Sequence, residues 1–173
     1  MKISNICIII LFLIFIFSHN ILANYAIDRV YYNVKVDLQK IESLELKIEN
    51  DLDTINTTGL KISHNGDKFN LLADWRINFL KRSTYNVNLN FLLPIELDGH
   101  KFGKGIGLSG EGFYASSNKF YWGLDYFANK DEWRYEVGII YPFVNDSYFR
   151  IGVGNTYWNS DNTLNLGFLV DIN

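Results

Sequence analysis

Residues 69–79 of the chain read Phe69-Asn70-Leu71-Leu72-Ala73-Asp74-Trp75-Arg76-Ile77-Asn78-Phe79. Every second residue from Phe69 to Phe79 is apolar, and the residues between them are polar except Leu72. Successive side chains of a β-strand point to opposite faces, so a period of two over eleven residues predicts a strand with one wholly apolar face.

The same alternation recurs along the chain. Apolar rows occupy alternate positions in Val30–Leu38, Leu44–Ile48, Tyr85–Phe91, Phe120–Tyr126, Trp133–Tyr141, Phe149–Val153 and Leu164–Ile172. A glycine-rich strand from about Gly103 to Tyr114 and a weaker one around Thr57 to Ser63 bring the count to ten, with eight as the fallback. No helical period, repeat or linker interrupts the pattern. We therefore predict an all-β fold, a single antiparallel barrel over residues 24–173.

Residues 1–23 have the composition of an export signal. Lys2 precedes an apolar run from Ile6 to Phe17, and Ser18 to Ala23 offer a cleavage site after Ala23. The alternative is a single membrane-spanning helix, but the run is shorter than the roughly 20 apolar residues that a span needs. We predict a signal peptide over residues 1–23.

The exported part has a composition that excludes several functions. It contains no cysteine, because the only one is Cys7, so a disulfide framework and thiol catalysis are excluded. Without Lys2 its charge is 15 Lys+Arg against 19 Asp+Glu, hence 15 − 19 = −4. A negative balance argues against nucleic acid as a partner, because phosphates require a basic face.

Alternation alone does not say whether the apolar rows face a protein core or lipid. A soluble secreted β-barrel or sandwich buries its apolar rows, whereas an outer-membrane barrel turns them outward. Segment lengths of about 9 to 11 residues suit a tilted membrane-crossing strand. Aromatic residues gather near strand ends, as in an interfacial girdle; they include Tyr31, Tyr32, Phe79, Tyr85, Phe91, Tyr114, Phe120, Tyr126, Trp133, Tyr141, Phe143, Tyr148, Phe149, Tyr157 and Trp158. We therefore predict a transmembrane barrel.

The polar rows then line the lumen, where an isolated charge costs several kcal/mol and must be paired or hydrated. We predict an interior polar network of Lys35, Glu45, Lys47, Asp74, Arg76, Glu111, Asp125, Arg134, Glu136 and Arg150. The same rows also carry Lys61, Asp37, Glu49 and Asp171. Because eight strands leave a lumen just filled by side chains, about ten strands predict a mostly plugged interior with at most a narrow, weakly cation-preferring path.

Hairpin parity predicts three registers. Asn65-Gly66 has the composition of a two-residue type I′ loop. A loop at Asn129-Lys130 places Asp125 opposite Arg134 rather than opposite Glu136. A loop at residues 116–118 pairs Gly112 with Trp122 and Gly110 with Leu124, so that bulky side chains cover the glycine backbone.

The segment Asn165-Leu166-Gly167-Phe168-Leu169-Val170-Asp171-Ile172 resembles the terminal signal by which bacterial outer-membrane barrels are recognised for insertion. Asn165, Gly167, Val170 and Ile172 carry the match, and Asn173 departs from the usual aromatic ending. In size and pattern the exported chain resembles small barrels of the OmpX and OmpA class; residues 92–114 loosely resemble a YfaZ-like barrel. The resemblance implies the bacterial outer membrane as location, with outer-membrane lipid and the barrel-assembly machinery as partners.

Three motifs have the composition of cofactor-binding or catalytic sites, but their positions in the predicted barrel do not suit that role. Gly105-Ile106-Gly107-Leu108-Ser109-Gly110 has dinucleotide-loop spacing but no following helix. Asp51, Asp53, Asp98 and His100 are similar to the acidic and histidine pairs of omptin proteases, but ten strands place the two groups at opposite membrane faces. Ser63 and His64 are adjacent in a strand and point to opposite faces.

No metal-ligand spacing is present, and we expect no cofactor. The functional prediction is a structural or surface-interaction role without catalysis, as a monomer. The alternatives are a narrow solute or ion channel, a lipid-modifying enzyme, or a soluble secreted β-barrel binding protein.

Overall fold

The computed structural model describes residues 27–37, 40–65, 68–97, 101–114, 117–155 and 161–172. The predicted signal peptide, residues 1–23, lies outside them. In the described ranges no helix is long and apolar enough to span a membrane.

The described residues form one β-sheet, and each strand pairs with its neighbours in antiparallel fashion. The strands are β1 (Arg29–Asp37), β2 (Lys40–Asp51), β3 (Asn56–Asn65), β4 (Lys68–Lys81), β5 (Tyr85–Glu96), β6 (Lys101–Phe102), β7 (Gly105–Phe113), β8 (Lys119–Phe127), β9 (Glu132–Val144), β10 (Ser147–Gly154) and β11 (Thr163–Asp171).

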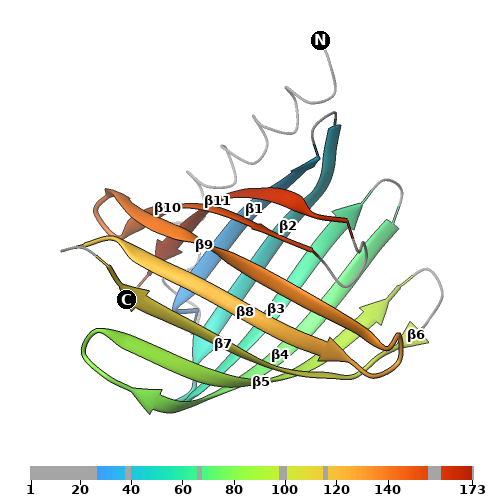
Figure 1. Cartoon of the computed structure of the whole chain (residues 1–173), viewed down its shortest axis with the longest axis horizontal. Coiled ribbons are helices and arrows are strands. Elements are labelled where there is room, and N and C mark those ends of the chain that lie inside the picture. The colour runs from blue at the N-terminus through green and yellow to red at the C-terminus, as the bar shows by residue number, and fades with distance from the viewer. Residues whose placement is uncertain are drawn as a thin grey trace.

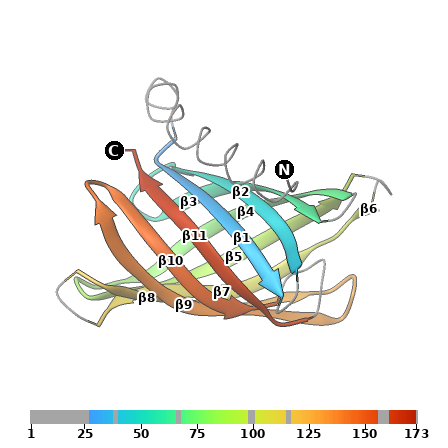
Figure 2. The ribbon, with the colours of Figure 1, turned by 90° about the horizontal axis from the view of Figure 1, so that it is seen from above.

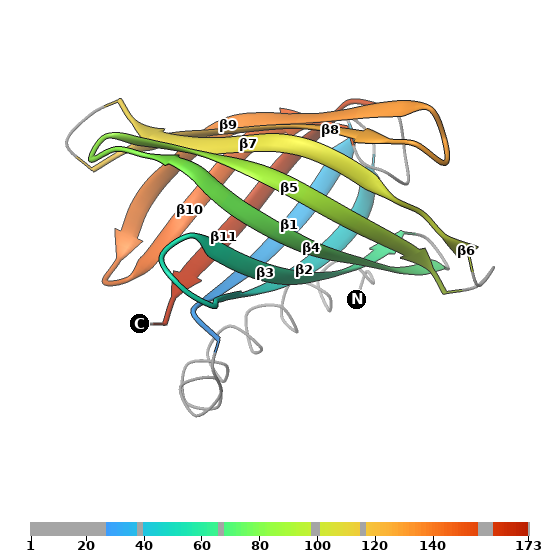
Figure 3. The same ribbon diagram turned by 90° about the horizontal axis from the view of Figure 1, so that it is seen from below.

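The sheet closes into a barrel of ten strands (Figure 1). β11 pairs with β1 and β4 pairs with β5, so both ends of the strand order are joined. The closed wall is visible from above and below (Figures 2 and 3). β6 is a two-residue extension that pairs only with the end of β5 and was not predicted. The predicted strand around Thr57 to Ser63 is present as β3, which decides for ten strands over the fallback of eight.

Apolar rows point outward and polar rows point into the lumen. On β4, Trp75 and Phe79 are 44% and 59% exposed, whereas Asn70 and Asp74 between them are 5% and 8% exposed. The same division holds on other strands, where the inward set includes buried Lys35, Glu45, Lys61, Asn90 and Asp125. A polar interior with an apolar exterior is the pattern of a transmembrane barrel, which confirms the predicted fold class.

Two members of the expected aromatic girdle, Tyr31 and Tyr148, lie on inward rows. Tyr148 shares the row of Arg150, and Lys119 Nζ lies 5.7 Å from the centre of its ring. Tyr31 is 5% exposed and its hydroxyl donates to Glu49 Oε2 at 2.9 Å, so it lies in the lumen. The reason is parity: Tyr31 is on the same row as Asn33, whereas Tyr32 is on the apolar row. Other members, such as Phe79, Tyr85 and Trp133, are exposed on the outer face.

One of the three predicted strand registers is confirmed, and the other two are shifted by two residues. Asp125 pairs with Arg134, although the turn spans residues 128–131. The predicted glycine pairings are wrong by two residues, because Gly112 pairs with Phe120 and Gly110 with Trp122.

The shift preserves the aromatic cover, since a Cβ on Gly112 would lie 2.5 Å from the Phe120 ring. The first hairpin keeps its predicted parity but pairs Asn65 with Lys68, which moves the loop to residues 66–67, outside the described ranges.

Inward-facing glycines leave room for the large lumen side chains. A Cβ on Gly107 would lie 2.0 Å from Asp125 Oδ1, and a Cβ on Gly152 would lie 2.3 Å from the Tyr121 hydroxyl. Both glycines are therefore required by close approach rather than by a turn. This spacing lets a narrow barrel hold charged and aromatic groups across its interior.

The orientation of the faces predicts the effect of a charge on the outer wall. Leu124, at the middle of β8, is 43% exposed, and Leu124→Arg is expected to lower the free energy of unfolding in lipid vesicles by about 2–4 kcal/mol because the charge enters hydrocarbon. Tryptophan fluorescence during denaturant titration measures the change. The control Ile55→Arg, in the turn between β2 and β3, should change it little. Equal, small effects at both positions would contradict a lipid-facing wall.

Candidate functional site

The lumen has two distinguishable ends. The terminal end holds the start of β1, the end of β11 and the turn of residues 52–55. The loop end holds the turn of residues 128–131 between β8 and β9. Antiparallel order places each inward residue at a definite height between these ends.

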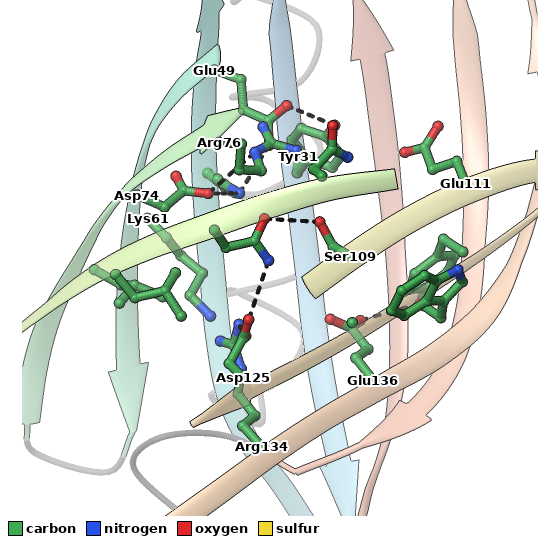
Figure 4. Close-up of a pocket in the computed structure, with 18 of the residues that line it drawn as sticks. Tyr31, Glu49, Lys61, Asp74, Arg76, Ser109, Glu111, Asp125, Arg134 and Glu136 are labelled. Atoms are coloured by element: carbon green, nitrogen blue, oxygen red, sulfur yellow. Dashed lines mark hydrogen bonds and ion pairs between the residues drawn. The ribbon is translucent and has the colours of Figure 1, made fainter. Parts of the chain in front are cut away.

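Glu49 is the centre of a charge cluster toward the terminal end. Lys47 Nζ lies 2.8 Å from Glu49 Oε1 and 2.8 Å from Asp74 Oδ2. Arg76 contacts Glu49, and its Nε lies 3.4 Å from Asp74 Oδ2. Arg29 Nε lies 3.3 Å from Glu49 Oε2, and Arg29 also contacts Asp51. The cluster joins β1, β2 and β4 on one side of the wall and compensates the buried Glu49 with three cations. Figure 4 shows Arg76 beside Glu49 and Asp74.

A second cluster surrounds Asp125 on the opposite wall. Arg134, directly across from it on β9, forms an ion pair with Asp125. Asn90 Nδ2 donates to Asp125 Oδ1 at 3.2 Å, and Ser109 Oγ donates to Asn90 Oδ1 at 3.0 Å. These residues come from β5, β7, β8 and β9, so the chain of hydrogen bonds ties four strands together (Figure 4).

Glu45 is the shared partner of two lysines. Lys35 and Lys61, from the flanking strands β1 and β3, each place Nζ 3.3 Å from Glu45 Oε1. All three side chains are almost completely enclosed. The carboxylate therefore bridges two cations that would otherwise repel each other.

Arg150 crosses the lumen between two aromatic rings. Its guanidinium carbon lies 4.1 Å from the centre of the Tyr121 ring and 5.1 Å from that of Tyr31. Tyr121 donates its hydroxyl to Glu136 Oε1 at 3.1 Å, and Asn165 Nδ2 donates to the same oxygen at 3.2 Å. Cation–π contacts and hydrogen bonds thus fill this level of the barrel.

The structure places all ten residues of the predicted interior network in the lumen. Nine of them line the mid-lumen cavity, and the tenth, Lys35, contacts Glu45 beside it. Glu111 has a long ion pair, since Lys119 Nζ lies 3.9 Å away. Arg29, Tyr31, Tyr121 and Phe127 also point inward and were missed; their position on the polar rows was the available signal.

The described residues line two adjoining cavities inside the barrel. The mid-lumen cavity measures about 130 Å³, and a mouth cavity of about 530 Å³ lies at the terminal end. Arg76, Asn88 and Glu111 line both, so the two spaces adjoin.

The mouth cavity also includes the turn residue Asp53. The Asn56 side chain and the backbone N–H groups of Ile55 and Asn56 donate to this carboxylate. These hydrogen bonds hold the pKa of Asp53 below its ordinary value. The Asp53 carboxylate therefore stabilises the turn of residues 52–55.

Where the structure describes them, the residues of the remaining motifs lie apart from one another or within a regular strand. Gly105 to Gly110 lie within strand β7. Ser63 is 1% exposed on the lumen side, while His64 stacks on Phe69 of the outer face with ring centres 4.5 Å apart. Asp98 and His100 lie outside the described residues. Among the described residues, no group of acidic, histidine or cysteine side chains could hold a metal ion.

The predicted insertion motif lies on β11, the strand that closes the barrel against β1. Gly167 pairs with Asn33, and a Cβ there would lie 2.1 Å from Asn33 Oδ1. Val170 pairs with Val30, and the Ile172 amide donates to the Asp28 carbonyl at 2.8 Å. Asn165 points into the lumen.

Comparison with solved structures agrees with the architecture. The KdgM porin in complex with disordered oligogalacturonate matches with a TM-score of 0.57 and 10% sequence identity, covering 84% of this chain and 99% of that one. A second structure of the KdgM porin matches with a TM-score of 0.53 and 11% identity, at the same coverage. A triple mutant of the Rhodopseudomonas blastica porin gives a TM-score of 0.43. No protein-family model and no curated protein sequence matches the chain. The fold is that of the small outer-membrane β-barrel class.

The Asp125–Arg134 pair makes a quantitative prediction. Asp125→Ala and Arg134→Ala are each expected to lower the free energy of unfolding by about 3–5 kcal/mol, because each leaves an uncompensated buried charge. The double variant should lose less free energy of unfolding than the two single variants lose together, since neither charge remains. Denaturant titration in lipid vesicles gives all three values. Glu132→Ala, an exposed carboxylate on the same strand, is the matched control, and strict additivity of the two losses would refute the coupling.

Proposed function

We propose that this chain is a bacterial outer-membrane barrel whose lumen is closed by its own side chains, with a structural or surface-interaction role. The observation that carries the proposal is the mutual pairing of the lumen charges around Glu45, Glu49 and Asp125. What they leave at mid-lumen is about 130 Å³, room for only a few water molecules. A solute the size of an oligosaccharide does not fit this space.

Features of the wall support the outer membrane as the location. The strand number is even, both described ends of the chain lie at one end of the barrel, and the outer wall is apolar with aromatics near the strand ends. We propose that Asn165, Gly167, Val170 and Ile172 act as the insertion signal read by the barrel-assembly machinery. The resemblance to the OmpX and OmpA class, and loosely to YfaZ, belongs to the same proposal, as does a monomer surrounded by outer-membrane lipid.

The charge of the mid-lumen supports a difference from an oligogalacturonate porin. Six carboxylates line the cavity, Glu45, Glu49, Asp74, Glu111, Asp125 and Glu136, against the five cations Lys47, Lys61, Arg76, Arg134 and Arg150. A polyanionic sugar would meet more negative than positive groups, and the cations are already engaged with carboxylates.

One observation favours a second candidate, a narrow path for small cations. The mouth cavity adjoins the mid-lumen cavity at Glu111, whose carboxylate is weakly paired and 31% exposed. Conductance separates this candidate from a closed barrel.

We also propose that the barrel has no catalytic role. His64 is stacked against Phe69 on the outer face, away from Ser63, which supports this view. A lipase or protease activity that is lost on His64→Ala or His100→Ala would overturn it.

Membrane fractionation tests the location. The protein should appear in the outer-membrane fraction and migrate faster on gels before heating than after, because the closed barrel resists detergent until heated. Recovery in the soluble periplasmic fraction would contradict a transmembrane barrel in that membrane.

Planar-bilayer recording tests the closed lumen. The refolded protein is expected to give no conductance steps, whereas KdgM porin recorded in the same apparatus serves as the open control. Steps in the wild type that Asp125→Ala or Arg134→Ala abolishes would favour the narrow channel instead. Steps carried by the unmodified barrel would in either case refute closure by the paired side chains.

A further inference from the structure

The two ends of the lumen differ in how far their inward side chains are exposed. Toward the terminal end, Glu111 and Lys119 are 31% and 29% exposed, and Asp51 is 42% exposed. Toward the loop end, Ser63 and Phe127 are 1% exposed and Thr163 is 3% exposed, whereas Glu96 at the rim is 30% exposed. The mouth cavity of about 530 Å³ likewise lies at the terminal end. The described mouth cavity thus opens at the terminal end, whereas the inward side chains of Phe127, Ser63 and Thr163 are enclosed near the loop end.

An apolar cluster occupies the closed part of this otherwise polar interior. Leu72, Leu92 and Phe127 pack together, and all three lie on inward rows that also carry charged or amide side chains. Leu92 and Phe127 both flank Gly105 in the strand register, on either side of it. A Cβ on Gly105 would lie 2.8 Å from the Phe127 ring, so the ring packs directly against the backbone of this glycine.

The ion-pair network holds this ring in place. The Arg134 guanidinium carbon lies 5.7 Å from the centre of the Phe127 ring, and Arg134 is paired with Asp125. Asp125 precedes Phe127 on the same row of β8 and accepts a hydrogen bond from Asn90. Phe127 is thus held by packing against Gly105, Leu72 and Leu92 and by a cation–π contact with Arg134.

We infer that Phe127 is the plug that closes the lumen toward the loop end. It packs against Gly105, Leu72 and Leu92. Polar solutes then enter only from the terminal end. An apolar constriction in a narrow lumen excludes water and ions by dewetting, which the paired charges alone do not do. This inference rests on the proposed closed barrel and names the place of closure.

Sided thiol labelling tests the plug. In a Cys7→Ser background, Asn88→Cys places a thiol on the wall shared by the two cavities. The protein is reconstituted in lipid vesicles, and a small, charged, membrane-impermeant methanethiosulfonate is added outside. Two reference variants, Asp53→Cys at the terminal end and Ala128→Cys at the loop end, give the fraction of barrels in each orientation.

With Phe127 present, the labelled fraction of Asn88→Cys should equal that of Asp53→Cys. Adding Phe127→Ala should raise it to the sum of the two reference fractions, because the thiol is then reached from both ends. Phe127→Leu should preserve one-sided labelling, and Phe120→Ala on the outer face of the same strand should leave it unchanged. Leu92→Ala thins the same cluster and replaces Phe127→Ala if that variant does not fold.

Labelling of Asn88→Cys in both orientations with Phe127 intact would overturn the plug, and so would unchanged labelling on its removal. These failures are distinguishable from failure of the proposed function. A wild type that gives no bilayer steps, while Phe127→Ala leaves labelling one-sided, is a closed barrel that is closed elsewhere. A wild type that conducts refutes both.

Discussion

The structure depends on one electrostatic constraint, which is that every charge inside a narrow barrel must have a partner. The outer face of the wall is apolar, and the polar half of each alternating strand faces inward. The lumen of ten strands is too narrow to hydrate these groups freely, and isolation would cost several kcal/mol for each. Glu49 with three cations and Glu45 between two lysines meet this requirement with contacts that cross from strand to strand.

Glycine makes this pairing possible in so small a space. The positions facing Asp125, Tyr121 and Phe127 carry no side chain, because a Cβ at Gly107, Gly152 or Gly105 would overlap them. Gly105 and Gly107, which belong to the stretch with nucleotide-loop spacing, therefore serve the packing of the wall. In the closure that we propose, the ion-pair network fills the middle of the barrel, and the Phe127 ring closes the lumen toward the loop end with an apolar surface.

Much of this could be predicted from the sequence because strand alternation is a local signal. The ten strands, the inward polar rows and the Asp125–Arg134 register follow from parity and from the preference for opposite charges. The Gly112 pairing did not follow, since Phe120 and Trp122 offer the same aromatic cover two residues apart. The convergence on Glu49 depends on barrel tilt and closure, which no local pattern encodes. Phe127 was missed because an apolar residue on a polar row carries no charge signal.

The central claim is that the Phe69–Phe79 row touches acyl chains while Asn70, Asp74 and Arg76 face an enclosed lumen. A nitroxide scan of residues 69–79 in lipid vesicles tests it most directly, with collisions measured against oxygen and against a water-soluble nickel chelate. Odd-numbered positions should show high accessibility to oxygen, and even-numbered positions should show low accessibility to both agents. High accessibility of the even-numbered positions to nickel chelate, with the odd-numbered positions shielded from oxygen, would contradict the account.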